Sequence, residues 1–252
     1  GLLEVDKHWY RFMMFGRLSY DLTLTRDYFE GRLRQRFPRV DATLLYDTFQ
    51  ASSRIVPQVN RFFFRYNDLQ FSPEGCIWRG GFLTVDDSFF SYPPLRGSEI
   101  LSVQEYAAAL RADEPFVGMT PMEVAKRLDA CAEQTLDGVR ALRQEADARE
   151  ELLSTLLDLE AMAYLGRYYA DKIRGAAELA VYRQDPSLKQ AHKKAIRHFS
   201  DAVSEWGTYA KAATRQYKPQ LFSRTHYMDW RKILEDVKKE LQAVKNEKPS
   251  EE

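Results

Sequence analysis

The chain has 252 residues, with 37 lysines and arginines against 37 aspartates and glutamates, and 44% of the residues are hydrophobic. The balanced charge argues against a dedicated nucleic-acid-binding protein, which usually carries a basic excess. The composition is that of a globular protein, and we expect no membrane span because no apolar run approaches the roughly 20 residues that a spanning helix requires.

The first part of the chain is predicted to be helical and rich in aromatic residues. Large apolar residues cluster over residues 8–18, and Thr25 is placed to cap a second helix that ends before Pro38. Apolar residues at helical spacing continue over residues 42–64, where Pro57 is expected to introduce a kink. This part of the chain therefore predicts short helices with an unusual share of large side chains.

Residues 67–98 interrupt the helical pattern. The segment is rich in proline and glycine, which predicts a long irregular connection with a short strand at residues 82–85. A connection of this length inside a compact domain is usually functional, disordered or a sign of a wrong element assignment, and its aromatic residues argue against disorder. Helix resumes after Ser102, which forms a capping box with Glu105.

Long helices are predicted for the rest of the chain. Thr120 and Glu123 form a second capping box, with proline at the first helical position. A second long helix carries small residues such as Gly166 that permit close helix approach, Pro186 ends it, and a third helix is expected to end at Pro219. A last helix is predicted to begin at Trp230.

These patterns predict an all-α fold: a multi-helix bundle of antiparallel helices with one long irregular loop region. We expect residues 1–115 to form an aromatic-rich helical segment with a loop insertion at about 67–98. Residues 120–245 are expected to form the long antiparallel helices, packed with the first part as one domain. A short helical-hairpin array is the alternative arrangement.

Several kinds of catalytic and metal site lack support in the sequence. Glycine-rich phosphate loops, a nucleophile elbow and a helix-borne zinc motif do not occur. His192 and His198 lie about 240° apart around a helix, so we expect no metal site from them. Cys76 and Cys131 are isolated, and adjacent acids such as Asp86 and Asp87 point in different directions, so neither a disulfide framework nor a catalytic acid pair is indicated. No cofactor is expected.

The best candidate for ligand contact is the loop at residues 67–81. Amide, carboxylate and guanidinium groups beside an aromatic ring suit a sugar, because sugar hydroxyls need directed hydrogen bonds and sugar rings stack on aromatic faces. The alternative is a loop that folds onto its own helices with its tryptophan as anchor. The carbohydrate-contact candidates are Trp78, Asn67, Asp68, Gln70, Glu74 and Arg79.

Other aromatic and basic residues are expected to be structural. Five aromatic residues fall on or beside helical stripes and are interpreted as core or interface residues. A basic run from Lys189 to Arg197 is interpreted as a solvated helix face because the chain is neutral. The five aromatic residues are Tyr164, Tyr168, Tyr169, Trp206 and Trp230.

One segment resembles a known family. Residues 9–21, with the sequence WYRFMMFGRLSYD, are followed by a capped helix ending in Arg36 and Phe37. This pattern resembles the segment that leaves the catalytic barrel in alpha-glucuronidase-type bacterial glycoside hydrolases and opens a C-terminal helical domain. The clear match covers about thirty residues, and Leu22 stands where the family pattern usually has proline.

The resemblance implies a role for the chain within a larger enzyme. It implies a non-catalytic C-terminal helical domain of a polysaccharide-degrading glycoside hydrolase, exported to the periplasm or cell surface. Such a domain packs on the catalytic domain of the same polypeptide, with dimerisation and contact with carbohydrate in the substrate cleft as further roles. The family's catalytic acids belong to the barrel, so we expect none here and expect the barrel to precede Gly1.

The sequence is also compatible with two other functions. A helical-hairpin module that binds a protein partner would gather its exposed aromatic residues on a dry groove between helices. A self-contained enzyme would require convergent titratable groups in one pocket.

Overall fold

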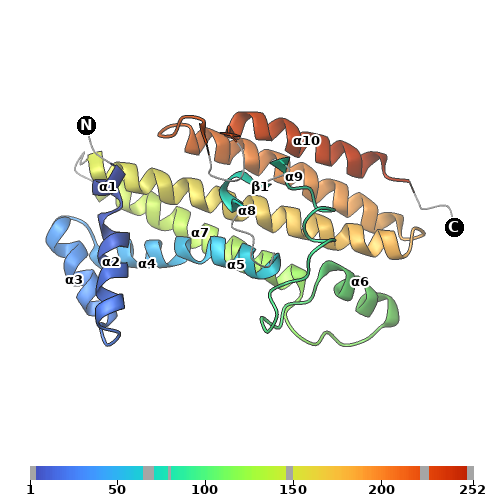
Figure 1. Ribbon diagram of the computed structural model, residues 1–252, viewed down its shortest axis with the longest axis horizontal. Helices are drawn as coiled ribbons and strands as arrows, with labels where there is room; N and C mark the ends of the chain where they lie inside the picture. Colours follow the sequence, from blue (N-terminus) through green and yellow to red (C-terminus); the bar gives the residue numbers. More distant parts are fainter. Residues whose placement is uncertain (1–3, 65–70, 79–80, 146–149, 222–226, 249–252) are drawn as a thin grey trace.

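The computed structural model describes residues 4–64, 71–78, 81–145, 150–221 and 227–248. Within them the chain is almost wholly helical, with two pairs of very short strands (Figure 1). The elements are α1 (Glu4–Lys7), α2 (Trp9–Tyr20), α3 (Arg26–Arg36), α4 (Ala42–Ser53), α5 (Ile55–Phe62), the 3₁₀ turn η1 (Pro73–Gly75), β1 (Ile77–Trp78), β2 (Gly81–Phe82), α6 (Val103–Ala112), α7 (Pro121–Glu145), α8 (Glu150–Gln184), α9 (Lys189–Ala213), β3 (Gln220–Leu221), β4 (Tyr227–Met228) and α10 (Trp230–Asn246).

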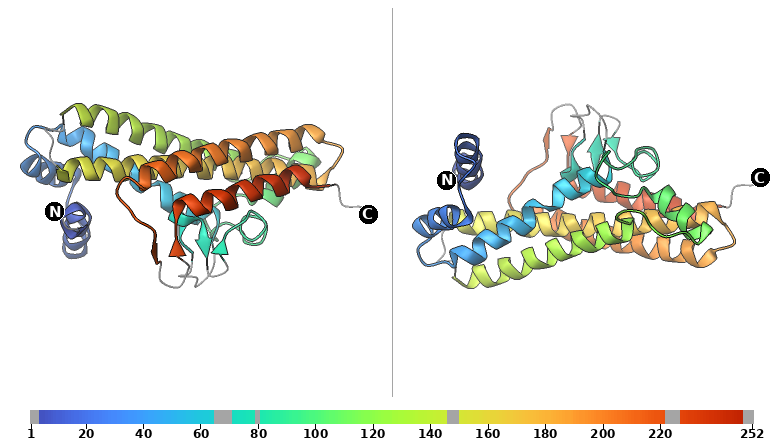
Figure 2. Two further views of the ribbon diagram at one scale, coloured as in Figure 1. Left: turned by 90° about the horizontal axis from the view of Figure 1, so that it is seen from above. Right: turned by 90° about the horizontal axis from the view of Figure 1, so that it is seen from below.

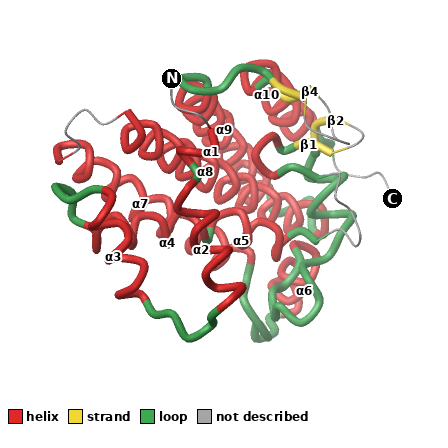
Figure 3. Tube along the Cα trace, turned by 60° about the vertical axis from the view of Figure 1, so that its left-hand side comes forward, coloured by secondary structure: helices red, strands yellow, loops and turns green. Residues whose placement is uncertain are grey.

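The long helix α8 is the centre of the architecture. It packs against α7 on one side and α9 on the other, and α10 packs on α9 (Figure 1). The helices α4 and α5 run along α7 and α8, while α2 projects sideways from this end of the bundle (Figure 2). The short strands lie together on one side of the helices (Figure 3). The predicted all-α bundle is thus confirmed, and no helix within the described ranges combines the length and apolarity needed to cross a bilayer.

The two predicted capping boxes are present at atomic level. The Ser102 hydroxyl accepts a hydrogen bond from the Glu105 backbone amide, and the Glu105 carboxylate accepts one from the Ser102 amide. Thr120 and Glu123 make the same reciprocal bonds at the start of α7. Thr25 occupies the N-cap position of α3 as expected, but its side chain makes no capping hydrogen bond.

The interruption predicted at Pro57 is present: the helix is divided at Arg54 into α4 and α5, because the proline ring conflicts with the carbonyl of the residue four positions earlier. Two other predicted boundaries are wrong. The third long helix ends at Ala213 rather than at Pro219. The strand expected at 82–85 is β2, at residues 81–82, with Phe82 paired to Ile77 of β1.

The main hydrophobic core is built around α8 and contains most of the aromatic residues assigned to it from the sequence. Trp206 and Tyr168 are fully buried and meet edge to face with ring centroids 4.7 Å apart. The Trp206 indole donates a hydrogen bond to the Trp230 carbonyl at 2.9 Å, which joins α9 to α10. Tyr169 is also buried, while Tyr164 is half-buried at the edge of the core.

A second, smaller core lies at the end of the bundle that carries α2. It packs Tyr10 of α2 and Phe29 and Leu33 of α3 against Leu156 of α8 and the neighbouring part of α7. The aromatic-rich first part of the chain therefore covers one end of the long helices.

A buried ion pair links α8 to α10 and to the loop after β2. The Lys172 ammonium lies 2.8 Å from a carboxylate oxygen of Glu240, and both side chains are at most 4% exposed. Lys172 also donates to the Leu83 carbonyl at 2.9 Å, and Glu240 accepts from the Val85 amide at 2.7 Å. The ammonium lies 4.6 Å from the centre of the Phe82 ring. Each charge is thus surrounded by groups that offset the cost of removing it from water.

Glycines set the spacing between α8 and its neighbours. A Cβ atom added at Gly166, as the small-residue pattern suggested, would lie 3.1 Å from Ile55. One added at Gly175 would lie 2.8 Å from the ring of Phe199, which is buried in α9. Both α5, which carries Ile55, and α9, which carries Phe199, approach α8 more closely than a larger residue at these glycine positions would allow.

We predict that Lys172→Met lowers the free energy of unfolding by about 3–5 kcal/mol, because it leaves the Glu240 carboxylate buried without its partner. Lys238→Met on α10, which removes a surface pair with Glu235, is the control and should cost less than about 1 kcal/mol. Urea unfolding curves measure both. Equal losses would show that the buried pair contributes no more than an exposed one.

We predict that Gly175→Ala destabilises the chain by about 1–3 kcal/mol, because the added methyl group overlaps Phe199 in a packed core. Gly207→Ala in α9 is the matched control, since nothing lies within 4 Å of a Cβ at that position. That substitution should stabilise by up to about 1 kcal/mol through helix propensity. Thermal unfolding of the two variants provides the comparison, and stabilisation by both would refute the close approach at Gly175.

Candidate functional site

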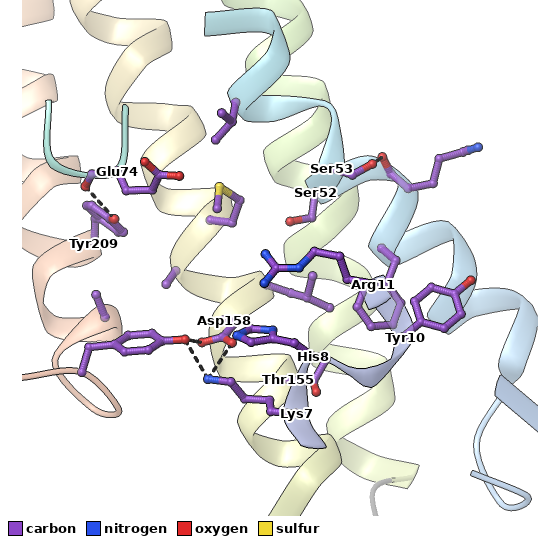
Figure 4. A pocket seen from close by; sticks show the side chains of 18 of the residues that line it. Lys7, His8, Tyr10, Arg11, Ser52, Ser53, Glu74, Thr155, Asp158 and Tyr209 are labelled. Carbon is purple, nitrogen blue, oxygen red and sulfur yellow. Dashed lines mark hydrogen bonds and ion pairs between the residues drawn. The ribbon is translucent and has the colours of Figure 1, made fainter. Parts of the chain in front are cut away.

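A cleft of about 810 Å³ opens between the two cores (Figure 4). Its walls come from segments far apart in the sequence: α1 and α2, the end of α4, the turn η1, the N-terminal part of α8, and the chain around the end of α9. Most of the lining is apolar, with a few polar side chains among the apolar ones. Its polar and charged side chains include Lys7, His8, Arg11, Gln50, Ser52, Ser53, Glu74, Asp158 and Gln220.

A three-residue network fastens α1 to the floor of the cleft (Figure 4). The Lys7 ammonium donates to the Tyr217 hydroxyl at 2.7 Å and lies 2.9 Å from the Asp158 carboxylate. The Tyr217 hydroxyl donates to the other Asp158 oxygen at 2.8 Å, and that oxygen also accepts from Gln216 at 2.7 Å. Both oxygens of Asp158 are therefore engaged by the protein.

Two members of this network have a raised pKa. Burial alone would lower the pKa of Lys7, but the bonds to Tyr217 and Asp158 outweigh it and raise the pKa to about 12. Burial, with the negative charge of Asp158 beside it, raises the pKa of the Tyr217 hydroxyl to about 12. Lys7 thus stays charged and Tyr217 stays protonated at neutral pH.

The turn η1 supplies another wall of the cleft. Tyr209 of α9 donates its hydroxyl hydrogen bond to the Glu74 carbonyl at 2.8 Å, and Tyr169 of α8 donates to the Pro73 carbonyl at 2.8 Å. The Glu74 carboxylate accepts from the Ser72 hydroxyl at 3.0 Å. The backbone of η1 is therefore fixed by two tyrosines from the bundle, with the Glu74 side chain at the cleft.

A further wall of the cleft is formed by α2 and α4. Tyr10 and Phe49 stack with centroids 4.8 Å apart and an angle of 27° between their planes. Arg11, one position further along α2, extends its guanidinium into the middle of the cleft (Figure 4). None of the ion pairs between described side chains involves Arg11.

Of the residues proposed from the sequence for carbohydrate contact, one lines the cleft, one lies away from it, and the other four are not described by the structure. Glu74 lines the cleft, whereas Trp78 is packed against the main core and is not part of the lining. Asn67, Asp68, Gln70 and Arg79 lie outside the described residues. Sequence reasoning missed Lys7, Asp158 and Tyr217, for which no local motif gives a signal.

Two further polar groups lie on the long helices α8 and α9. His192 stacks on Tyr182 with centroids 4.3 Å apart and lies 2.7 Å from the Val244 carbonyl. The potential ligand atoms of Asp171, His198 and Asp201 lie within 4.8 Å of one another on α8 and α9. We assign no metal to them because Asp171 is already paired with Arg174.

The chain was compared with known proteins by sequence and by structure. No family model matches the chain, and no curated protein matches it in sequence. A solved structure, described as that of a GH138 enzyme targeting pectin rhamnogalacturonan II, superimposes with a TM-score of 0.78 at 14% identity. The match covers 96% of this chain and 38% of that one, so the chain spans well under half the length of this glycoside hydrolase. The two proteins share a fold over that region.

We predict that the Lys7 network makes stability sensitive to alkaline pH. Lys7 and Tyr217 both hold their protons more tightly in the folded state, so their contribution is present below about pH 10 and is lost as pH rises toward 12. The double variant Lys7→Met, Tyr217→Phe should lose less stability over that range than the unaltered chain. Urea unfolding at several pH values tests this, with Lys211→Met, an exposed lysine on α9, as control. Parallel pH profiles for the double variant and the unaltered chain would rule the network out as the cause.

Proposed function

We propose that this chain is a non-catalytic helical domain of a polysaccharide-degrading glycoside hydrolase and that it packs on the catalytic domain of the same polypeptide. The observation that carries the proposal is the extent of the structural match, which takes in 96% of this chain but 38% of a glycoside hydrolase. A domain of this size leaves most of such an enzyme elsewhere. The resemblance of residues 9–21 to a segment that leaves a catalytic barrel supports the same arrangement.

The chemistry of the cleft supports a non-catalytic role for the chain. A glycosidase requires two carboxyl groups that flank a scissile bond, one of them free to donate a proton. Asp158, on the cleft floor, is held by Lys7, Tyr217 and Gln216. This carboxylate is thus committed to structure, and Glu74 is the one other carboxylate among the described residues that line the cleft, so these residues provide no flanking pair.

The exposed face of α2 is our candidate for the contact with the catalytic domain. Phe12 and Phe15 are 54% and 76% exposed, and Tyr20 and Leu22 just beyond are 92% and 86% exposed. A run of large side chains left in solvent on a projecting helix is typical of a surface that another protein surface covers. Since α2 follows α1 near the beginning of the described chain, a domain that precedes it in the polypeptide would lie close to this face (Figure 2).

The proposal also covers contact with carbohydrate, the organisation of the domain and the location of the parent enzyme. Carbohydrate bound by the parent enzyme would contact this domain at the cleft beside Glu74 and at the loop that holds the other sequence-derived candidates. Residues 1–115 and 120–245 would act as one domain in this arrangement. A periplasmic or cell-surface enzyme follows from the same resemblance.

We predict that this chain and the remainder of its parent polypeptide, expressed separately, associate and co-elute in size-exclusion chromatography. Phe12→Ser with Phe15→Ser should weaken the association about tenfold or more, because each buried phenylalanine contributes roughly 1.5–3 kcal/mol. The control is Val117→Ser, which removes an 84% exposed apolar residue near α6 at the other end of the bundle.

Other results would change the assignment. If the two parts do not associate, or if Val117→Ser is as damaging as the α2 variant, the α2 face is not the contact. A helical-hairpin module that binds a separate protein then becomes the better explanation of the exposed residues.

A further inference from the structure

The cleft combines the features of a small-ligand site. Its volume of about 810 Å³ lies within the roughly 300–1,000 Å³ of pockets that enclose drug-sized ligands. The lining is largely apolar, and a few polar groups converge on the same space from different elements. In such sites the apolar surface supplies affinity and the polar groups set the orientation of the ligand.

The charged groups of the cleft differ in how many ion pairs they form within the protein. Lys7 and Asp158 satisfy one another and Tyr217. Arg11 is exposed and forms no ion pair within the described part of the chain, and its guanidinium stands in the middle of the cleft (Figure 4). A guanidinium offers a planar fork of donors that matches the two oxygens of a carboxylate or sulfate group. Arg11 therefore supplies a binding group for an anion.

Glu74 supplies the complementary group on another wall. Its carboxylate accepts a hydrogen bond from Ser72, and a carboxylate has about four acceptor positions in all. The backbone carbonyl of Glu74 is held by Tyr209, so the residue is fixed in place. The remaining acceptor positions suit hydroxyl groups, which donate hydrogen bonds. The hydroxyls of Ser52 and Ser53 lie along the same cleft (Figure 4).

Phe49 adds an apolar surface to the same lining. It is half-buried in the cleft lining, and Tyr10 stacked on it holds its ring in position. Aromatic rings in such settings pack well against the C–H faces of sugar rings. A donor fork, a hydroxyl-binding carboxylate and an aromatic ring together fit a ligand with an anionic group, several hydroxyls and an apolar face.

We infer that the cleft is a saccharide-binding site of this chain in its own right and that it selects sugars carrying a carboxylate or sulfate group, with the anion on Arg11 and hydroxyls on Glu74. The choice of a saccharide rests on the proposed function, whereas the preference for an anion rests on Arg11 alone.

Calorimetric titration of the 252-residue chain tests the inference with three tetrasaccharides. One consists of uronic acid residues, one is the carboxyl-reduced neutral counterpart, and one is the neutral tetrasaccharide after sulfation. At least one anionic tetrasaccharide should bind about tenfold more tightly than the neutral one, as expected for a charge-assisted hydrogen bond. The stronger of the two anionic ligands identifies the group that Arg11 prefers.

Three variants assign the binding to the cleft. Arg11→Gln should abolish the preference for the anionic ligand, while Glu74→Gln should weaken the binding of all three tetrasaccharides. Arg17→Gln, an exposed arginine on the same helix that does not line the cleft, is the matched control and should bind as the unaltered chain does. Circular dichroism spectra of each variant confirm that it is folded.

The inference is overturned if no tetrasaccharide binds, if neutral and anionic ligands bind equally, or if Arg17→Gln loses as much affinity as Arg11→Gln. The last result would mean that the general positive charge of α2 attracts the ligand. Because the titration uses this chain alone, its outcome is independent of the association with a catalytic domain. If the chain binds the tetrasaccharides but does not associate with the catalytic domain, the cleft site is supported and the packing role is refuted. If the chain associates with the catalytic domain but binds no tetrasaccharide, only the cleft site is refuted.

Discussion

The buried pair of Lys172 and Glu240 is the constraint on which the arrangement around the bundle depends. A charge inside a protein core is tolerated only when its partners are all in place, and here they come from α8, α10 and the loop after β2. The pair therefore ties both α10 and residues 83–85 to α8. That loop continues from β1, β2 and η1, and so the same pair helps to fix the wall of the cleft to which Glu74 belongs.

The sequence was sufficient for most of the helical architecture because the signals for helices are local. The capping boxes at Ser102 and Thr120 and the apolar stripes along α7 and α8 depend on residues a few positions apart. The errors occurred where distant contacts decide the outcome. The chain leaves α9 at Ala213, and Tyr217, four residues later, reaches the carboxylate of Asp158 on α8. No pattern within α9 itself could have shown this.

The candidate site was much less predictable, for a physical reason. Glu74 was proposed because the irregular segment around it stands out from the helices, but Lys7, Asp158 and Tyr217 are ordinary residues at unremarkable positions in three separate parts of the chain. Only tertiary packing brings them within hydrogen-bond distance. Trp78 illustrates the opposite case, since the residue with the most obvious affinity for a sugar ring is packed against the core. Burial of apolar surface thus competes with ligand binding for the same aromatic side chains.

The helix α2 connects the two proposed roles of the chain. Arg11 and Phe15 are four positions apart, so they lie one turn apart on the same face of the helix. Arg11 reaches into the cleft, whereas Phe15 remains in solvent. A domain that covered Phe15 would therefore border the mouth of the cleft and restrict its opening. It would also exclude water near Arg11, and a lower local dielectric strengthens the attraction between a guanidinium and an anion. Packing of a catalytic domain on α2 and binding of an anionic sugar would then favour one another, although the two surfaces share no residue.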